Sequence, residues 1–426
     1  ILRIARMKGC PWDEYTCDAA AQGGHFEVLQ WAHLNGCPWE SGTCFFAAKC
    51  NNFQMLRFAH ENGCPLSSSI ASLAASANNL PMLQWAIDNG CPVDEWVAVS
   101  AAMGGHLSLL QWAIANGVPL TKSTFSSAAQ NDNFPILELL FANHCPWDQA
   151  ACASAAAKGH LNVLQWLRKR ECPWDFSTCV AAAEHGHLKV LQWARKNGCP
   201  WTETTCSRAA MNGHLEILQF ARANLCPWNT YTILNAAIYN KLNTLQWAIE
   251  NGCEFDHANE KEKIFLLAAQ RGNLQISKYF VTSGLVDPAD VSYNTVCLCA
   301  ASRGDFKMLK WARSLNFPCD CSAFAAAANS GNMAMLRWML SEGCPWDANV
   351  CAMAARKGNL HVLQWARSHG CPWNEETCTN AAAYGHLHVL KWAKTNGCPW
   401  NNDVVVRATE HGHPDIVQWA KRNGWP

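Results

Sequence analysis

The stretch that decides the fold is residues 172–198, CPWDFSTCVAAAEHGHLKVLQWARKNG, because close copies of it fill almost the whole chain. Each copy ends near a glycine such as Gly198, and the next copy begins at once. With Cys10 as the first residue of a copy, thirteen copies have 27 residues and two have 32, and together they cover residues 10–424. A fixed step of this length is typical of solenoid proteins, in which each repeat packs mainly against its neighbours.

The order of residues within the copy predicts two short helices. Asp175 is a good N-cap, and the equivalent position holds Asp, Asn, Ser or Thr in 12 of the 13 regular copies. Gly186 can take the left-handed conformation that ends the first helix. A second helix from about His187 would place leucines and Ala194 on one face, and Gly198 would end it. Such a small hairpin cannot bury its own apolar face, so we expect the copies to stack.

The junction between the two helices resembles the ankyrin repeat, which has two alanines, then Gly-His-Leu and a leucine-rich helix. One copy carries these equivalents: Ala155, Ala156, Gly159, His160, Leu161, Val163 and Leu164. The copies are shorter than the ankyrin repeat of about 33 residues, lack its Thr-Pro-Leu-His segment, and reduce its projecting finger to little more than CPWD. They look like the short, Cys/Trp-rich ankyrin repeats of giant viruses and protists. The resemblance implies such an origin, and protein binding as the function.

The predicted fold is therefore all-α, an ankyrin-like α-solenoid of about 15 stacked helix-turn-helix repeats. The expected segments are 1–9 (partial repeat, second helix only), 10–252 (nine 27-residue repeats), 253–316 (two 32-residue repeats), 317–424 (four 27-residue repeats) and 425–426 (tail). Because the chain opens at Ile1 inside a repeat, we expect an upstream segment, and an effector domain would fit there.

Two polar insertions account for the longer repeats. Residues 256–263 and 286–294 lie just before a predicted first helix, at the place of the ankyrin finger. One interpretation is a tolerated surface loop, because loops accept insertions readily. The other is a local binding protrusion or a joint between two parts of the solenoid.

Composition excludes several classes of protein. Lys+Arg and Asp+Glu balance at 33 each, charged residues make up 15% and hydrophobic residues 50% of the chain, so it is neither a disordered tail nor an electrostatic nucleic-acid binder. No apolar stretch reaches the length of a membrane span, and no leader peptide is visible. We expect an intracellular, cytoplasmic protein (in the host cytoplasm if viral), with no nucleic-acid partner, no membrane insertion and no small-molecule substrate.

The cysteines and histidines do not form a recognisable catalytic or metal site. Seven copies carry Cys at positions 1 and 8, as in Cys172 and Cys179, but no CxxC occurs. Equivalent residues of neighbouring repeats should lie about 8–10 Å apart, too far for a disulfide ladder. We expect free, buried cysteines, and histidines of the Gly-His turn bonded to backbone. Without a nucleotide-binding loop or a nucleophile motif, we expect no cofactor, no metal and no enzyme activity.

The tryptophans follow the same period. Eleven occupy position 22 and nine occupy position 3, which favours packing within and between repeats over a base-stacking platform. Only Trp96 and Trp425 fall outside these two series.

The candidate partner-binding residues occupy positions that differ between copies. In an ankyrin-like stack the first helices form the concave surface, where positions 5, 6, 9, 10 and 13 vary and would meet a partner. Phe45 and Phe46 have an alternative role, as packing against neighbouring helices. We expect a partner groove across residues 14–130. The full set of candidates is Tyr15, Phe45, Phe46, Trp96, Met103, Arg208, Met211, Tyr231, Arg356 and Arg407, with Met353 beside the later ones.

The sequence thus favours a module that binds a protein partner along its concave face. An architectural scaffold or linker rod within a large assembly is the alternative. An enzymatic or metal-dependent role would require bound zinc or a perturbed thiol.

Overall fold

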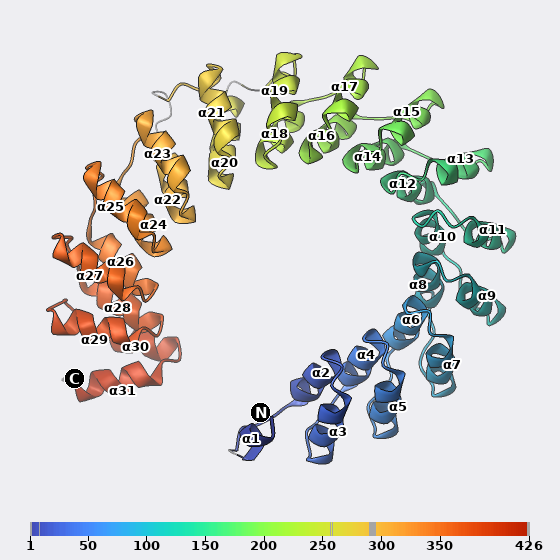
Figure 1. Cartoon of the computed structure of the whole chain (residues 1–426), viewed down its shortest axis with the longest axis horizontal. Helices are drawn as coiled ribbons and strands as arrows, with labels where there is room; N and C mark the ends of the chain where they lie inside the picture. The colour runs from blue at the N-terminus through green and yellow to red at the C-terminus, as the bar shows by residue number, and fades with distance from the viewer. Residues whose placement is uncertain (1, 8, 256, 258, 289–294, 424–426) are drawn as a thin grey trace. The chain divides into compact units, whose positions relative to one another are not determined.

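The computed structural model describes residues 2–7, 9–255, 257, 259–288 and 295–423. Within these ranges every regular element is a helix and no strand occurs, so the prediction of an all-α solenoid is confirmed (Figure 1). The chain forms two compact units, Ile1–Trp228 and Asn229–Pro426.

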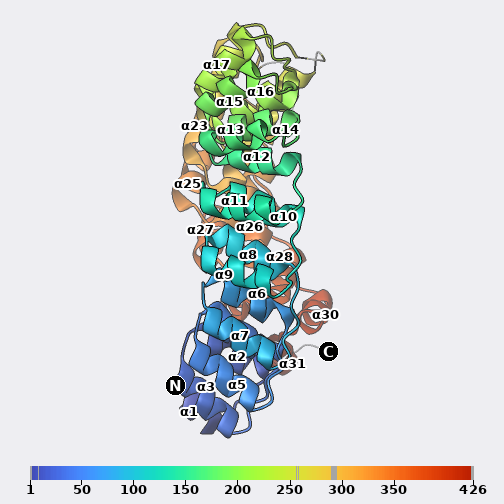
Figure 2. The same ribbon diagram turned by 90° about the vertical axis from the view of Figure 1, so that its right-hand side faces the viewer.

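Two kinds of helix alternate along the chain. The first helices of the repeats are α2 (Glu14–Gln22), α4 (Ser41–Lys49), α6 (Ser68–Ser76), α8 (Trp96–Gly104), α10 (Lys122–Ala129), α12 (Gln149–Ala157), α14 (Phe176–Glu184), α16 (Glu203–Asn212), α18 (Thr230–Ile238), α20 (Glu260–Arg271), α22 (Thr295–Arg303), α24 (Cys321–Ser330), α26 (Ala348–Arg356), α28 (Glu375–Ala383) and α30 (Asp403–Glu410). The second helices are α1 (Leu2–Met7), α3 (Phe26–Leu34), α5 (Phe53–Glu61), α7 (Leu80–Asp88), α9 (Leu107–Ala115), α11 (Phe134–Ala142), α13 (Leu161–Lys169), α15 (Leu188–Lys196), α17 (Leu215–Ala223), α19 (Leu242–Glu250), α21 (Leu274–Thr282), α23 (Phe306–Ser314), α25 (Met333–Ser341), α27 (Leu360–Ser368), α29 (Leu387–Thr395) and α31 (Pro414–Arg422). Figure 2 shows the helices of the first unit rising one above another in chain order.

The local signals read from residues 172–198 produce the helices as predicted. The Asp175 carboxylate accepts a hydrogen bond from the backbone N–H of Ser177 at 2.9 Å, which caps α14. Gly186 follows α14 with a φ of 85°, a conformation that favours glycine. His187 then precedes α15, at the residue expected.

The core of each repeat is shared with its neighbours. The alanine pair of α14, Ala182 and Ala183, is fully buried, and α14 packs against both α12 and α16. On α15, Val190, Leu191 and Ala194 are buried beneath the first helices. Small side chains let the first helices approach closely, and this explains why the alanine pair recurs.

The cysteines join repeats through their thiols. All 24 are free, and most are buried, except that Cys10 and Cys50 are exposed. The S–H of Cys199 donates to the backbone carbonyl of Asp175 at 3.3 Å, and Cys64 donates to Glu40 at 3.0 Å. The same bond to the N-cap residue of the preceding repeat occurs at further positions, with acceptors 24 residues earlier: Cys37, Cys91, Cys145, Cys172, Cys226, Cys253, Cys371 and Cys398.

Residue 16 of the repeat joins neighbours in a second way. His187 Nε2 lies 3.1 Å from the backbone carbonyl of Ala157, and the equivalent bond to the preceding repeat is made by His106, His160, His214, His386 and His413. This confirms the backbone-bonded histidine for six of the seven Gly-His turns; for His25 the equivalent partner position lies before residue 1. Asn52, at the same position, instead caps its second helix and accepts from Met55 N at 3.0 Å. Asn273 behaves like the histidines and donates to the backbone carbonyl of Ala237 in the preceding repeat at 2.7 Å.

The tryptophans pack within and between repeats, as expected. Trp174 meets Trp193 edge to face with ring centroids 5.9 Å apart, which joins positions 3 and 22 of one repeat. Arg195, at the end of the second helix, lies over the ring of Trp201 in the next repeat at 4.0 Å and also donates to the Cys199 carbonyl. Each such set fixes the turn between one repeat and the next.

The two insertions differ from the expectation in part. Residues 260–263, which we expected in a loop before the first helix, form the beginning of α20, a helix of 12 residues. Helix propensity explains this, because Glu-Lys-Glu-Lys favours a helical turn. Residues 256, 258 and 289–294, which make up much of the two predicted loops, lie outside the described residues.

The contact between neighbouring turns predicts unequal effects of two matched substitutions. Gly186 and Gly198 both have a φ of 85°, but an added Cβ at Gly186 would lie 2.8 Å from Cε1 of His214, whereas at Gly198 nothing lies within 4 Å. Gly198→Ala should lower the local opening free energy by about 1–2 kcal/mol through backbone strain. Gly186→Ala should lower that free energy by about 1–3 kcal/mol more, because the added Cβ clashes with the ring of His214. Hydrogen exchange of α14 to α17 measures both losses, and equal losses would contradict the inter-repeat contact.

The thiols should react in an order set by burial. Desolvation raises the pKa of Cys145 to about 12 and also raises that of Cys91, so neither forms thiolate readily near pH 8. In native protein, iodoacetamide should label Cys10 and Cys50 first, and in guanidinium it should label all 24 cysteines. Peptide mass spectrometry against time gives the order. Early labelling of Cys145 would show that the repeats open far more often than the packing indicates.

Candidate partner-binding surface

The candidate surface lies on the first helices. We call it the first-helix face: the residues at positions 5, 6, 9, 10, 13 and 14 of each repeat, counted from the residue that opens it (Cys172 for residues 172–198). These positions lie away from the buried alanine pair and carry partly or fully exposed side chains in most repeats. Side chains that join repeats through the fixed positions, such as Cys199 and Arg195, and the paired Trp193 stand outside this set, so the face is free of the main packing residues.

In the first unit the candidate aromatic residues reach solvent to different degrees. Tyr15 is 69% exposed and Trp96 54%, and Met103, two helical turns after Trp96 on the same helix, is also 54% exposed. Phe45 and Phe46 are half-buried and meet edge to face at 5.3 Å, with Lys49 over the Phe45 ring at 5.9 Å. The two phenylalanines therefore combine packing with a surface that a partner can reach.

Arg208 and Met211 form a separate group on α16. Arg208 Nη1 lies 3.5 Å from the Met211 sulfur and 3.6 Å from the Glu184 carboxylate on α14. An ion pair this exposed contributes little to stability, about 0–1 kcal/mol. The ion pair with Glu184 nevertheless orients the Arg208 guanidinium on the first-helix face.

The second unit contains the other three candidates. Tyr231 is 61% exposed and lines a hollow of about 260 Å³ together with Glu260 and Lys263 of α20. Arg356 and Arg407 line two further hollows, one between α22 and α28 and one between α26 and α30. These two hollows adjoin because Met353 and Tyr384 line both of them.

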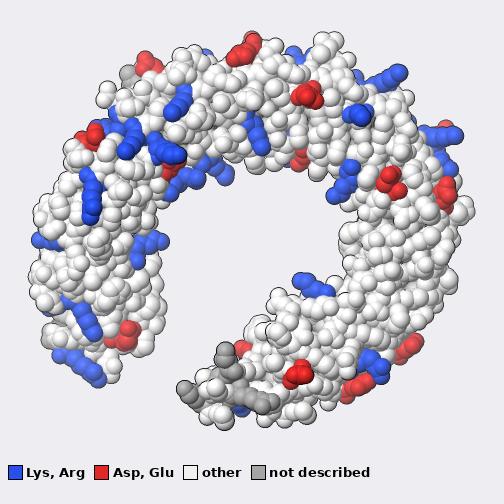
Figure 3. Space-filling view, viewed as in Figure 1, with Lys and Arg blue, Asp and Glu red and all other residues white. Residues whose placement is uncertain are grey.

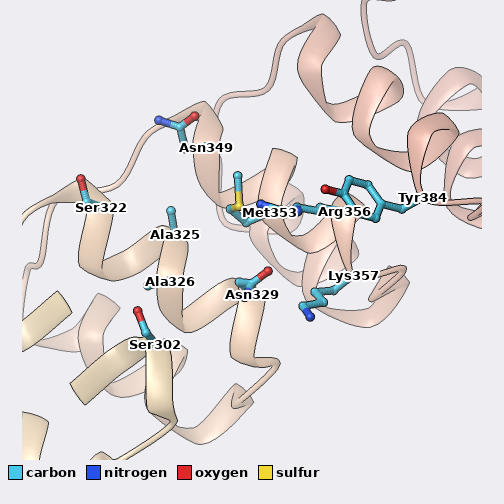
Figure 4. Close-up of a pocket in the computed structure, with 10 residues that line it drawn as sticks. All are labelled: Ser302, Ser322, Ala325, Ala326, Asn329, Asn349, Met353, Arg356, Lys357 and Tyr384. Carbon is cyan, nitrogen blue, oxygen red and sulfur yellow. The ribbon is translucent and has the colours of Figure 1, made fainter. Parts of the chain in front are cut away.

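The first of the adjoining hollows has about 440 Å³ and is lined mainly by small polar side chains and two cations (Figure 4). Figure 4 shows Met353, Arg356 and Tyr384 in a row, with Asn329 and Lys357 to one side of it. The Arg356 guanidinium lies over the Tyr384 ring at 4.9 Å, and the Tyr384 and His411 rings have centroids 6.4 Å apart. Three successive repeats thus contribute to one row of side chains.

Sequence reasoning missed Tyr384 and Lys357. Both occupy position 14, which was not among the positions taken as partner-facing, although it varies widely, with Lys158, His185 and Tyr239 in other copies. The variation between copies was the available signal. Tyr384 is 44% exposed, in keeping with the other members of the first-helix face.

The described residues contain no group of three or more His, Cys, Asp or Glu side chains that could hold a metal ion. No helix in the described ranges is long and apolar enough to cross a membrane. The hollows contain no nucleophile paired with a base and an orienting group. The side chains that line them offer hydrogen-bond donors and acceptors, charges and an aromatic ring.

The repeat architecture defines an α-solenoid, and comparison with known proteins assigns the type of repeat. Residues 179–222, from α14 to α17, match the family model described as ankyrin repeats (many copies). The chain is thus an α-solenoid in which residues 179–222 are similar to ankyrin repeats. No curated protein sequence matches it.

Solved structures show similarity at low identity. The pentatricopeptide repeat protein PPR10 from maize is 13% identical with a TM-score of 0.33, and the match covers 99% of this chain and 75% of that one. PPR10 in complex with an 18-nt psaJ RNA element matches at 13% identity with a TM-score of 0.31, over 96% of this chain and 75% of that one. The human ASB11 ankyrin repeat domain is 14% identical with a TM-score of 0.29, over 37% of this chain and 84% of that one. These values carry no information about what this chain binds.

The two classes of tryptophan should differ in their effect on stability. Trp96→Ala removes an exposed side chain from the first-helix face and should change the local opening free energy by less than about 0.5 kcal/mol. Trp193→Ala removes one ring of a half-buried pair and should lower it by about 1–3 kcal/mol. Hydrogen exchange of α8 and α15 measures each effect. A loss for Trp96→Ala as large as that for Trp193→Ala would make Trp96 a packing residue.

Proposed function

We propose that this chain is a non-enzymatic recognition module that binds a protein partner along its first-helix face, the concave face of an ankyrin-like stack. The observation that supports this best is the separation of roles among its large side chains. Those that join repeats are buried or paired, whereas Tyr15, Trp96, Met103 and Tyr231 are more than half exposed at positions that vary between copies. Exposed aromatic, Met and Arg residues are the types that dominate binding energy at protein interfaces.

A protein partner fits the charge of the surface better than a nucleic acid. The chain has a formal net charge of zero, and in Figure 3 the charged side chains stand singly or in small groups over a largely uncharged surface. Nucleic-acid binding draws most of its affinity from clustered Lys and Arg. We therefore propose no nucleic-acid partner, no bound cofactor and no small-molecule substrate.

The free thiols support a reducing compartment. All 24 cysteines are unpaired, and persistent free cysteines at this density are typical of the cytoplasm. We propose cytoplasmic localisation, in the host cytoplasm if the chain is of the viral type. The short viral and protist class of ankyrin repeat stays a prediction from the sequence.

The second candidate function is an architectural rod within a large assembly. The regular Trp pairs and Arg-Trp contacts that follow the second helices favour it, because they make a uniform outer surface that neighbours in an assembly can cover. In that case the first-helix face would contribute little to binding.

An affinity capture compares the two functions directly. The full chain and its Phe45→Ala/Phe46→Ala/Trp96→Ala variant are each used to capture proteins from extract of the native cell, with mass spectrometry as the readout. For a recognition module with its groove in residues 14–130, we expect one stoichiometric protein that the variant loses. A Trp193→Ala variant serves as the matched control, because it removes an aromatic ring from outside that face.

Retention of the same proteins by both chains would place the groove elsewhere. Capture of a set of assembly components by every variant would favour the rod. Circular dichroism on each variant confirms that the helices are intact before the captures are compared.

A further inference from the structure

The two adjoining hollows of the second unit differ in charge. The first, formed by α22 to α28, contains Arg356 and Lys357 and no carboxylate among the residues that line it. The second, formed by α26 to α30 with a volume of about 580 Å³, contains Glu375, Glu376 and Asp403. Its arginine, Arg407, is already paired with Glu410 at 3.1 Å. The sign of the charge therefore reverses across Met353 and Tyr384, which line both hollows.

Four of these charges form no ion pair with another described residue. Arg356 and Lys357 are exposed, as are Glu375 and Glu376, and none of the four takes part in an ion pair within the part of the chain that the structure describes. The Arg356 guanidinium lies over the Tyr384 ring, which fixes its direction and leaves its N–H groups free to donate. Asn329, half-buried in the first hollow, has a side-chain amide that can bond a peptide group.

We propose that this pair of hollows binds an extended segment of a partner protein with an acidic side chain over Arg356 and Lys357 and a basic side chain over Glu375 and Glu376. The proposal rests on the proposed function and names the chemistry of the partner. Met353 and Tyr384 between the two hollows provide an apolar and aromatic surface for the residues that link the two charges.

The spacing of the two charges in the partner follows from the spacing of the helices. Packed helices lie about 8–10 Å apart, and an extended chain rises about 3.3 Å per residue. Arg356 ends α26, whereas Glu375 begins α28, so the two charges are also offset along the helix axis by eight residues, about 12 Å. Together with the step between helices this places them about 15 Å apart, which corresponds to four or five extended residues. The partner segment should carry its acidic and basic residues four or five positions apart, in either order along the chain.

A bare anion does not fit the site as a whole. An isolated phosphate or carboxylate would satisfy Arg356 and Lys357 but would leave the three carboxylates of the second hollow without a cation. A nucleic acid would meet these carboxylates with its own negative charge, and like charges at an interface are repulsive. A peptide that carries both signs complements both hollows.

Selection of displayed peptides by the full chain tests the proposal. Random twelve-residue peptides on phage are selected on the full chain, and binding of an enriched peptide is then measured by fluorescence polarisation. We expect enriched peptides with an acidic and a basic residue four or five positions apart. Arg356→Glu/Lys357→Glu should weaken binding at least about tenfold, because it places like charges together. Replacing the acidic residue of the peptide by Lys should restore binding to that variant.

Matched variants separate charge from folding. Lys391→Glu, a single charge reversal at an exposed position on the second helix α29 of the neighbouring repeat, should leave the Kd unchanged. Glu375→Lys/Glu376→Lys should select against the basic residue of the peptide, and Arg356→Gln/Lys357→Gln should weaken binding without reversing the preference. Raising the salt concentration should weaken binding to the wild-type chain, since exposed charge pairs are screened.

The outcomes distinguish this site from the proposed function. Enrichment without the acid-base pattern, or equal binding by the charge-reversed chain, overturns the proposal. If the enriched peptides lose binding to Phe45→Ala/Phe46→Ala/Trp96→Ala instead, the chain is a recognition module and this site is wrong. If no peptide is enriched but affinity capture yields a stoichiometric protein, the proposal of this charged site is wrong and the proposed function is supported. If no peptide is enriched and no stoichiometric protein is captured, both the proposed site and the proposed function are contradicted.

Discussion

A repeat of two nine-residue helices has more apolar surface than it can cover, so its fold depends on contact with the next repeat. In this chain the first helices carry that contact through fully buried alanine pairs such as Ala182 and Ala183. Close approach of the helices brings backbone carbonyls of one repeat within reach of the next. The thiol of Cys199 and the imidazole of His187 then bond to carbonyls of the preceding repeat. Helix packing and polar contacts therefore depend on each other.

Because packing residues and surface residues occupy mostly different positions of the repeat, the first-helix face can accept substitutions without loss of the fold. The alanine pairs, the cysteines at position 1 and the turn histidines lie at fixed positions outside the variable set, whereas the exposed ion pair of Arg208 and Glu184 belongs to it. A substitution at Trp96 or Arg356 leaves the alanine pairs, the thiols and the turn histidines as they are. The solenoid can therefore combine one constant interior with a different surface in each repeat, and the two hollows of opposite charge are an example.

The fold could be read from the sequence because its signals are local and repeated. Asp175, Gly186 and the spacing of the leucines on the second helix each predict an element that the structure contains. The role of the thiols was only partly predictable. The spacing of Cys172 and Cys179 within one copy drew attention to that pair, whereas the buried Cys179 thiol faces the carbonyl of Cys199 in the next repeat at 4.0 Å. Contacts between copies depend on the distance and angle of stacking, which a period does not specify.

The candidate surface was predictable in its positions but not in its shape. Variation between copies pointed to the positions of Arg356 and Arg407, yet not to the hollows that they line. Each hollow is formed by three or more successive first helices, so it exists only once they are stacked. Tyr384 illustrates the limit, since position 14 follows the end of its helix and its exposure depends on the turn that comes after it.

The bonds between repeats also bear on how such a chain changes in length. The second helices α15 and α17 begin at Leu188 and Leu215, 27 residues apart, and these two repeats offer the same carbonyls to their neighbours and receive the same donors. Duplication or loss of one whole repeat joins a donor to an equivalent acceptor and leaves no bond unmade, whereas loss of a few residues would break the series. Unequal crossing-over between copies in the gene can therefore lengthen or shorten the protein in a single step. Each such event keeps the fold and alters the order of side chains offered to a partner.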